Sequence, residues 1–104
     1  MIWIFGDQHR AQALSCNNDV NVHTPNIDNM GVDGVNFTNA LSGFPLCCPF
    51  RGSLLTGRYP HHCVPGHEYP LPDGQKTIAH AFNDAGYHTA LVGKHHMTSD
   101  KPAA

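Results

Sequence analysis

The sequence has few charged residues and no run of charges of one sign. Charged residues make up 13% of the 104 positions, lysine and arginine together number six, and the formal net charge is −2. Proteins that bind nucleic acid or an anionic membrane electrostatically usually carry a concentrated basic patch. The composition therefore gives no reason to expect either partner, and we expect no nucleic acid and no membrane.

Long hydrophobic runs and a recognisable leader segment are also missing. The first apolar stretch, residues 2–5, is much shorter than the roughly 20 residues that span a bilayer, and shorter than the apolar region of a signal peptide. If Met1 is the true start, we expect a cytoplasmic protein whose four cysteines are reduced or used chemically. Because both ends of the sequence are abrupt, we expect residues 1–104 to be one part of a longer domain.

Histidine is the one residue type in excess. Nine of the 104 residues are histidine, while the hydrophobic content of 40% is ordinary for a folded globular chain. Imidazole binds metals and carries protons near neutral pH. The excess therefore favours metal, phosphate or sulfate chemistry.

Three stretches predict strands of a buried parallel sheet. Residues 2–5 form a continuous apolar run, and residues 35–41 and 88–92 are rich in β-branched and aromatic side chains. Gly6-Asp7 follows the first run, and Gly93-Lys94 follows the third. Open α/β sheets bind ligands at the carboxyl ends of their strands, which places Asp7 and Lys94 at such an edge.

Helix signals separate the predicted strands. Thr24 and Pro25 are typical of a helix start that would end at Gly34, and Thr77 and Gly86 mark the ends of another. Strands that alternate with helices indicate an α/β fold with a helix-covered parallel sheet. Residues 59–76 contain four prolines, and we expect a long loop there without regular structure.

The stretch Cys47-Cys48-Pro49-Phe50-Arg51 is the most chemically suggestive part of the sequence. Pro49 predicts the first position of a helix that Gly57 would end. Cys47 would then lie at a helix N-terminus, where free N–H groups and the helix dipole attract anions and make a thiol more reactive. Arg51 would add a planar set of donors suited to a tetrahedral oxyanion.

A metal-binding module is the competing interpretation of the histidines and cysteines. His61, His62, Cys63 and His67, together with the cysteine pair 47–48, would offer nitrogen and sulfur ligands for Zn²⁺, although no pair has a standard zinc-site spacing. Plainer structural roles also stay open. Asp7 would cap a turn, Cys47 would fill an apolar space, and Lys94 and His96 would belong to a solvated loop.

The motif Cys47-x-Pro49-x-Arg51, followed by Leu55-Thr56-Gly57-Arg58, resembles the signature of the type I sulfatases of the alkaline-phosphatase superfamily. Phe50 stands where that signature usually has serine. Asp7-Gln8 resembles the family's metal pair after the first strand. Gly93-Lys94-His95-His96 resembles a later family segment in which tryptophan usually stands at the position of His95.

The resemblance implies an incomplete N-terminal part, residues 1–104, of an alkaline-phosphatase-like doubly wound domain. It implies hydrolysis of a sulfate ester by formylglycine, which a formylglycine-generating or an anaerobic sulfatase-maturating enzyme makes from Cys47. One hydroxyl of its hydrate attacks sulfur and the other later expels sulfate. Arg51 would orient the hydrate, Lys94 would contact the sulfate, and His96 would bond the nucleophile or protonate the leaving group.

The same resemblance implies a divalent metal held by Asp7, Gln8 and the modified Cys47. The hard oxygen donors favour Ca²⁺, with Mg²⁺ or Mn²⁺ as alternatives. Cys48 occupies the variable position of the motif and has no role in this scheme. A phosphonate or phosphate monoester hydrolase of the same superfamily remains an alternative, as does a non-functional product of a truncated gene. We expect residues 1–104 alone to have no sulfatase activity.

Overall fold

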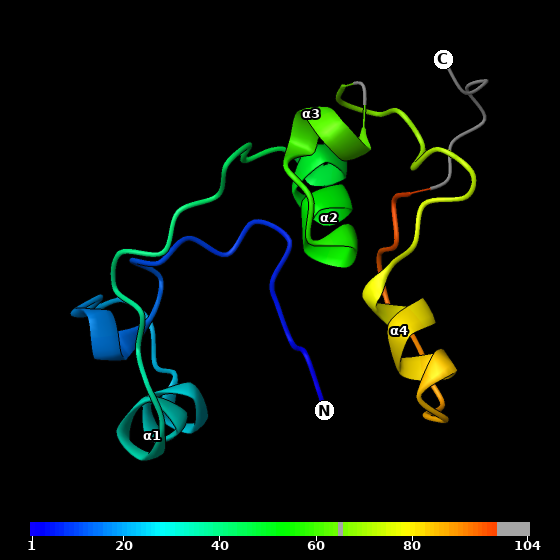
Figure 1. Cartoon of the computed structure of the whole chain (residues 1–104). Helices are drawn as coiled ribbons and strands as arrows, with labels where there is room; N and C mark the ends of the chain where they lie inside the picture. Colours follow the sequence, from blue (N-terminus) through cyan, green and yellow to red (C-terminus); the bar gives the residue numbers. More distant parts are fainter. Residues whose placement is uncertain (65, 98–104) are drawn as a thin grey trace. The chain divides into compact units, whose positions relative to one another are not determined.

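The computed structural model of the chain describes residues 1–64 and 66–97 (Figure 1). In chain order these residues form a 3₁₀ helix and four α-helices: η1 (Ser15–Asn17), α1 (Pro25–Asp33), α2 (Cys47–Thr56), α3 (Pro60–Cys63) and α4 (Ile78–Asp84). The chain divides into two compact units, of which the first is Met1–Leu41 and the second begins at Ser42. Within the described residues, no helix is long and apolar enough to cross a membrane.

In the first unit, a polar network joins α1 to η1. The Asp28 carboxylate accepts hydrogen bonds from the Ser15 hydroxyl (2.5 Å), the Thr24 hydroxyl (2.9 Å) and the backbone N–H of Cys16 (3.1 Å). The hydrogen bond from Ser15 is the main reason that the pKa of Asp28 lies below its usual value. Partial desolvation, reinforced by Asp28, raises the pKa of the Cys16 thiol. Because neither helix buries a residue, these polar contacts rather than an apolar core hold them together.

The predicted ends of α1 are confirmed. Thr24 precedes the helix, Pro25 is its first residue and Gly34 follows its last. A proline at the first position loses nothing, since the N–H groups of the first turn have no partner within the helix. The Thr24 hydroxyl bonds the Asp28 side chain and makes no capping bond to a backbone N–H.

In the second unit, α2 begins at Cys47, two residues earlier than Pro49 predicts. Pro49 is therefore the third helical residue, and its missing N–H still falls among the groups that have no partner in a first turn. The predicted end is confirmed. Gly57 takes the left-handed conformation (φ 68°), and its N–H donates to the carbonyl of Ser53 at 2.8 Å.

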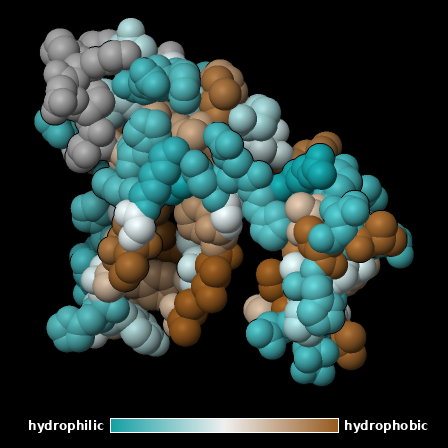
Figure 2. Space-filling view, turned by 180° about the vertical axis from the view of Figure 1, so that it is seen from behind, coloured by the Kyte–Doolittle hydropathy of each residue, from teal (hydrophilic) through white to brown (hydrophobic). Residues whose placement is uncertain are grey.

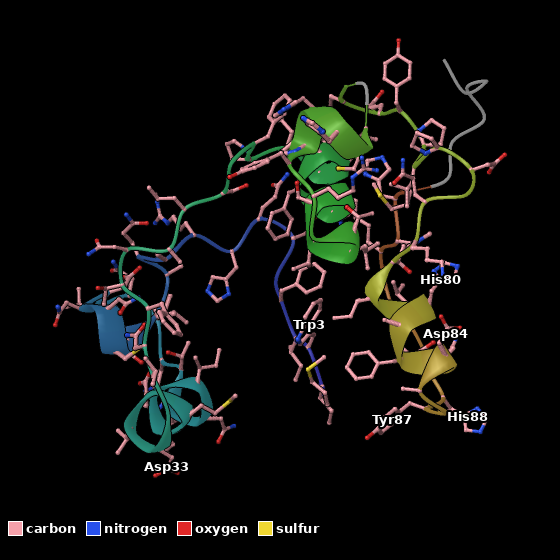
Figure 3. The ribbon with its side chains drawn as sticks, in the orientation of Figure 1. Trp3, Asp33, His80, Asp84, Tyr87 and His88 are labelled. Atoms are coloured by element: carbon pink, nitrogen blue, oxygen red, sulfur yellow. The ribbon has the colours of Figure 1, made fainter. Side chains whose placement is uncertain are left out.

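The prediction that residues 59–76 have no regular structure is wrong at α3, which begins at Pro60. The prediction of a helix after Thr77 is confirmed by α4. The Thr77 backbone N–H donates to Nδ1 of His80 at 3.1 Å, which satisfies one group at the helix start. Figure 3 labels His80 near the start of α4 and Asp84, its last residue.

The three predicted strands do not form, since the described residues contain no strand. The exposed fractions of Ile2, Ile4 and Val92 are 84%, 87% and 98%, and hydrophobic residues lie at the surface in Figure 2. A strand needs a neighbouring backbone to satisfy its N–H and C=O groups, and an isolated extended segment does not hold together in water. The described residues therefore do not confirm the expected α/β sheet.

Candidate active site

Cys47 is the first residue of α2 and is half-buried. The residue before it, Leu46, is extended, so the chain enters the helix at this cysteine. The first regular hydrogen bond of the helix runs from the Phe50 N–H to the Leu46 carbonyl at 3.0 Å. The backbone N–H groups of the first turn that lack such bonds attract negative charge at this end of the helix.

The far side of α2 is fixed by close packing on α3 and the residue after it. A Cβ atom added to Gly52 would lie 2.6 Å from Cγ2 of Val64 and 3.1 Å from Sγ of Cys63. Both partners are buried, with exposed fractions of 4% and 2%. Only glycine lets α2 come this close to Cys63 and Val64, and this close packing fixes the position of α2 in the second unit.

Residues 94–97 are tied to α2 by hydrogen bonds to their backbone carbonyls. Arg51, which is only 6% exposed, donates from Nη1 to the carbonyl of Lys94 at 2.5 Å. The buried thiol of Cys48 donates to the carbonyl of His96 at 3.4 Å. On the other side, the carbonyl of Met97 accepts the backbone N–H of Leu71 at 3.0 Å. The segment is thus held between α2 and the loop that contains Leu71.

This arrangement brings the side chain of Lys94 to Cys47. The ammonium Nζ donates to the Sγ atom of Cys47 at 3.4 Å, although 47 positions separate the two residues in the sequence. Both atoms belong to the second unit. A cation and the positive end of a helix therefore converge on the cysteine, and this combination suits an anionic substrate.

His96 follows Lys94 by two residues and is half-buried. Its Nδ1 atom is buried and has no hydrogen-bond partner within the described part of the chain. The backbone of His96 is left-handed (φ 54°), a conformation that a residue with a Cβ atom seldom adopts. The bond between His96 and α2 is made by its carbonyl, so the predicted role of its ring stays a prediction.

Asp7 and Gln8 belong to the first unit, where both are exposed. Of the predicted site residues, the second unit contains Cys47, Arg51, Lys94 and His96. The role of Asp7 and Gln8 as metal ligands stays a prediction.

The alternative zinc module finds no support in residues 1–64 and 66–97. No group of three or more histidine, cysteine, aspartate or glutamate side chains lies close enough there to hold a metal ion. His61 and His62 instead pack ring edge against ring face with centroids 4.2 Å apart, and the Cys63 thiol donates to the carbonyl of Pro60 at 3.4 Å. His61, His62 and Cys63 thus make ring-packing and hydrogen-bond contacts in place of the metal coordination that the zinc interpretation predicts.

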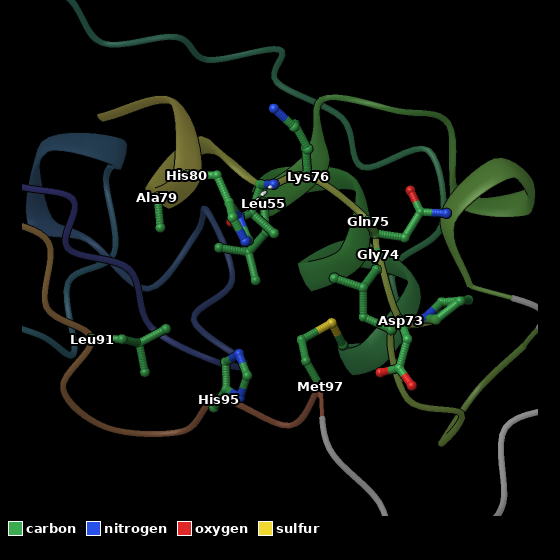
Figure 4. A pocket seen from close by; sticks show the side chains of 13 residues that line it. Leu55, Asp73, Gly74, Gln75, Lys76, Ala79, His80, Leu91, His95 and Met97 are labelled. Atoms are coloured by element: carbon green, nitrogen blue, oxygen red, sulfur yellow. Dashed lines mark hydrogen bonds between the residues drawn. The ribbon is translucent and has the colours of Figure 1, made fainter. Parts of the chain in front are cut away.

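Sequence reasoning missed two features of the site. Cys48, at the variable position of the motif, is 1% exposed and bonded to a residue 48 positions away. A cavity of about 810 Å³ also lies in the second unit and has His95 and Met97 on its wall, together with Leu55 of α2 and residues of α4 (Figure 4). Its lining residues lie between positions 55 and 97, so no local sequence pattern predicts the cavity.

Comparison with known proteins gives a consistent result. A family model described as Sulfatase matches residues 1–104. The chain is 40% identical to an ulvan-active sulfatase of Formosa agariphila, with all of this chain covered, and 37% identical to an arylsulfatase of Clostridium perfringens, with 97% covered. It is 35% identical over 79% of its length to the human steryl-sulfatase. The chain spans about a fifth of the length of the first two relatives and 16% of the third. No solved structure matches significantly.

Proposed function

Because the chain belongs to the sulfatase family, we propose that it is part of an enzyme that hydrolyses sulfate esters, with Cys47 as the precursor of its nucleophile. The observation that supports this most directly is the 3.4 Å contact between the Lys94 ammonium and Sγ of Cys47. It joins the two motifs at the position where the nucleophile and the sulfate would meet.

The residues around Cys47 would bind and orient the substrate. The ammonium of Lys94 and the free N–H groups at the start of α2 would meet the charge on the sulfate oxygens, which grows as the ester bond breaks. The guanidinium of Arg51 bonds the backbone of Lys94, so one task of this arginine is to fix where the lysine stands. His96 would protonate the leaving oxygen, a task that suits an imidazole.

Formylglycine, made from Cys47 by a formylglycine-generating or an anaerobic sulfatase-maturating enzyme, would supply a hydrated aldehyde whose hydroxyl is the nucleophile. Its side chain would occupy the place of the Cys47 thiol, next to Lys94. The half-buried position of that thiol limits the access of bulk water to the reacting centre.

For the metal, we propose Ca²⁺, with Asp7, Gln8 and the modified Cys47 among its ligands. A carboxylate and an amide oxygen are hard donors that fit Ca²⁺, Mg²⁺ or Mn²⁺ better than a softer metal. These three residues do not fill the 6–8 positions around Ca²⁺, so further ligands are required. When bound, the metal would supply Lewis-acid stabilisation of the negative charge at the reacting centre.

For the fold, we propose the alkaline-phosphatase-like α/β architecture that the family implies. The exposed apolar run at residues 2–5 and the exposed Val92 support this, because each would be covered once neighbouring strands are present. In that arrangement Asp7 and Lys94 would follow two strands of one sheet.

Mass spectrometry of the whole protein, produced together with a maturating enzyme, tests the proposed nucleophile. Conversion of a cysteine to formylglycine lowers its mass by about 18 Da, and we expect this change at Cys47 and not at the adjacent Cys48. The same preparation should hydrolyse an aryl sulfate, and the Cys47→Ala variant should not. Full activity with an unmodified Cys47 thiol would contradict the mechanism.

Parallel rates on sulfate, phosphate and phosphonate esters test the substrate class. The cationic surroundings of Cys47 would attract any of these anions, so only the ratio of kcat/KM values discriminates. We expect the sulfate ester to react fastest. A faster phosphonate or phosphate ester would assign the protein to the alternative reaction.

A further inference from the structure

The side chain of Lys94 depends on how residues 94–97 are held, since this segment carries it to the start of α2. Two carbonyls of the segment, those of Lys94 and His96, accept side-chain hydrogen bonds from α2, one from Arg51 and one from Cys48. The donors stand on the helix at positions 51 and 48, three residues apart, so they lie on one face of it. The segment is therefore fixed along that face at two points.

The hydrogen bond from Cys48 is made at His96, the residue of this segment whose backbone conformation is least favourable. His96 is left-handed at φ 54°, and a residue with a Cβ atom holds that conformation only where its surroundings impose it. The carbonyl of that same residue receives the Cys48 thiol at 3.4 Å. The thiol is also the more deeply buried of the two tethers, at 1% exposure compared with 6% for Arg51.

We propose that Cys48 is a positioning residue, which holds the left-handed turn at His96 so that the Lys94 ammonium stays on residue 47. The proposal rests on the proposed function for its kinetic consequence, but its structural part does not. The alternative is that Cys48 merely fills space under the segment. A filler would tolerate loss of the donor if the volume were kept, whereas a tether would not.

Cys63 offers a matched control. It is also a buried thiol, at 2% exposure, and it also bonds a carbonyl at 3.4 Å. That carbonyl belongs to Pro60 of its own helix, so the bond does not reach residues 94–97. Cys63→Ala and Cys48→Ala therefore remove the same atom from similarly buried places, and only Cys48→Ala removes a hydrogen bond to residues 94–97.

The hydrogen-exchange rate of the Leu71 amide, measured in the whole protein, reports whether the bond from Cys48 holds residues 94–97 in place. The N–H of Leu71 donates to the carbonyl of Met97, so it exchanges faster if the segment detaches. We expect Cys48→Ala to raise its exchange rate about fivefold, the effect of losing one modest hydrogen bond. Cys48→Ser, which keeps an O–H donor, should restore most of the protection, and Cys63→Ala should leave the rate unchanged. If Cys48→Ala does not fold, Cys48→Val fills the site with an apolar side chain that has no donor.

Kinetics on a sulfate ester test the consequence for catalysis. A misplaced Lys94 would mainly weaken contacts to charge that develops in the transition state, so kcat should fall about tenfold in Cys48→Ala while KM changes little. Recovery in Cys48→Ser and normal kcat in Cys63→Ala are the expected controls. Equal losses in Cys48→Ala and Cys63→Ala, or unchanged Leu71 exchange in Cys48→Ala, would overturn the proposal. An inactive wild-type protein would refute the proposed function instead, and the Leu71 result would still decide the tether.

Discussion

At the scale of single residues, the contact between Lys94 and Cys47 depends on residues other than these two. Arg51 holds the backbone of the lysine, and Gly52 lets α2 lie against α3 and Val64 without a side chain between them. Arg51 is only 6% exposed, so its charge is largely removed from water and its hydrogen bonds are made to groups of the protein. The position of the Lys94 ammonium thus depends on the buried guanidinium of Arg51 and on the lack of a side chain at Gly52.

Replacement of Lys94 by alanine should lower kcat/KM for a sulfate ester about 10²–10³-fold, because a preorganised donor to the developing charge is removed. The backbone carbonyl that Arg51 bonds remains in this variant, so the segment should stay in place. Lys76→Ala is the control: Lys76 is exposed and its nearest acidic partner, Asp84, is 3.9 Å away. We expect that variant to stay within about twofold of the wild type, as is usual for a surface pair. Equal effects of the two substitutions would contradict the role of Lys94.

Replacement of Gly52 by alanine should destabilise the protein by about 1–3 kcal/mol, since the new Cβ would lie 2.6 Å from Val64 and force α2 and α3 apart. Gly31→Ala is the matched control, because a Cβ at that position of α1 meets nothing within 4 Å. It should stabilise by about 0.5–1 kcal/mol through helix propensity. Urea unfolding measures both free energies, and a neutral Gly52→Ala would show that the packing is looser than the structure has it.

At the scale of elements, the junction of η1 and α1 is electrostatic, so its stability should depend on pH. The pKa of Asp28 is lowered on folding, chiefly by the bond from Ser15. A group with a depressed pKa stabilises the folded state above its unfolded pKa, about 3.9 for aspartate, and this stabilisation disappears as pH falls through the lower, folded value. The first unit should therefore lose order below about pH 4.

Asp28→Asn tests this dependence. The variant should be less stable than the wild type at neutral pH, and the difference between the two should shrink as the pH falls below about 4. Circular dichroism over that pH range measures it. Asp33→Asn, at the last position of α1, is the control and should be neutral or slightly stabilising, because a carboxylate at a helix C-terminus opposes the dipole. A constant difference between Asp28→Asn and the wild type at all pH values would argue against the junction as described.

Helices could be predicted where the signal is local. Thr24-Pro25, Gly57 and Thr77 mark the ends of α1, α2 and α4 correctly, since capping depends on residues a few positions apart. The strands could not, because apolar runs form a sheet only when other backbones lie beside them. The hydrogen bond of Cys48 could not be predicted for a related reason, because its partner is a backbone carbonyl, that of His96, 48 positions away.

At the scale of the whole molecule, the chain leaves large apolar side chains in water. Leu41 is 95% exposed and Phe37 76%, in addition to the apolar residues of the first run. Isolated exposed side chains are normal, but consecutive apolar residues indicate a surface that another part of a protein covers. This agrees with relatives about five times as long as the chain.

Residues 1–104 alone should not hydrolyse an aryl sulfate, even with formylglycine at position 47. Asp7, Gln8 and the modified Cys47 offer too few ligands for Ca²⁺. No group of three or more histidine, cysteine, aspartate or glutamate side chains in residues 1–64 and 66–97 could hold a metal ion. The measurement compares the isolated chain with the whole protein, both matured and both supplied with Ca²⁺. Turnover by the isolated chain at a rate near that of the whole protein would refute the expectation.

On the proposed mechanism, the contact between Lys94 and Cys47 would set an order of events during synthesis. A maturating enzyme would have to take the cysteine into its own active site, and it would be hindered once α2 has formed and the lysine contacts the thiol. Lys94 is added to the growing chain 47 residues after Cys47, which at about 5–20 residues per second leaves roughly 2–9 seconds. The proposed oxidation of the cysteine and the docking of the lysine would then compete for one time interval, and slower folding should give a larger fraction of modified protein.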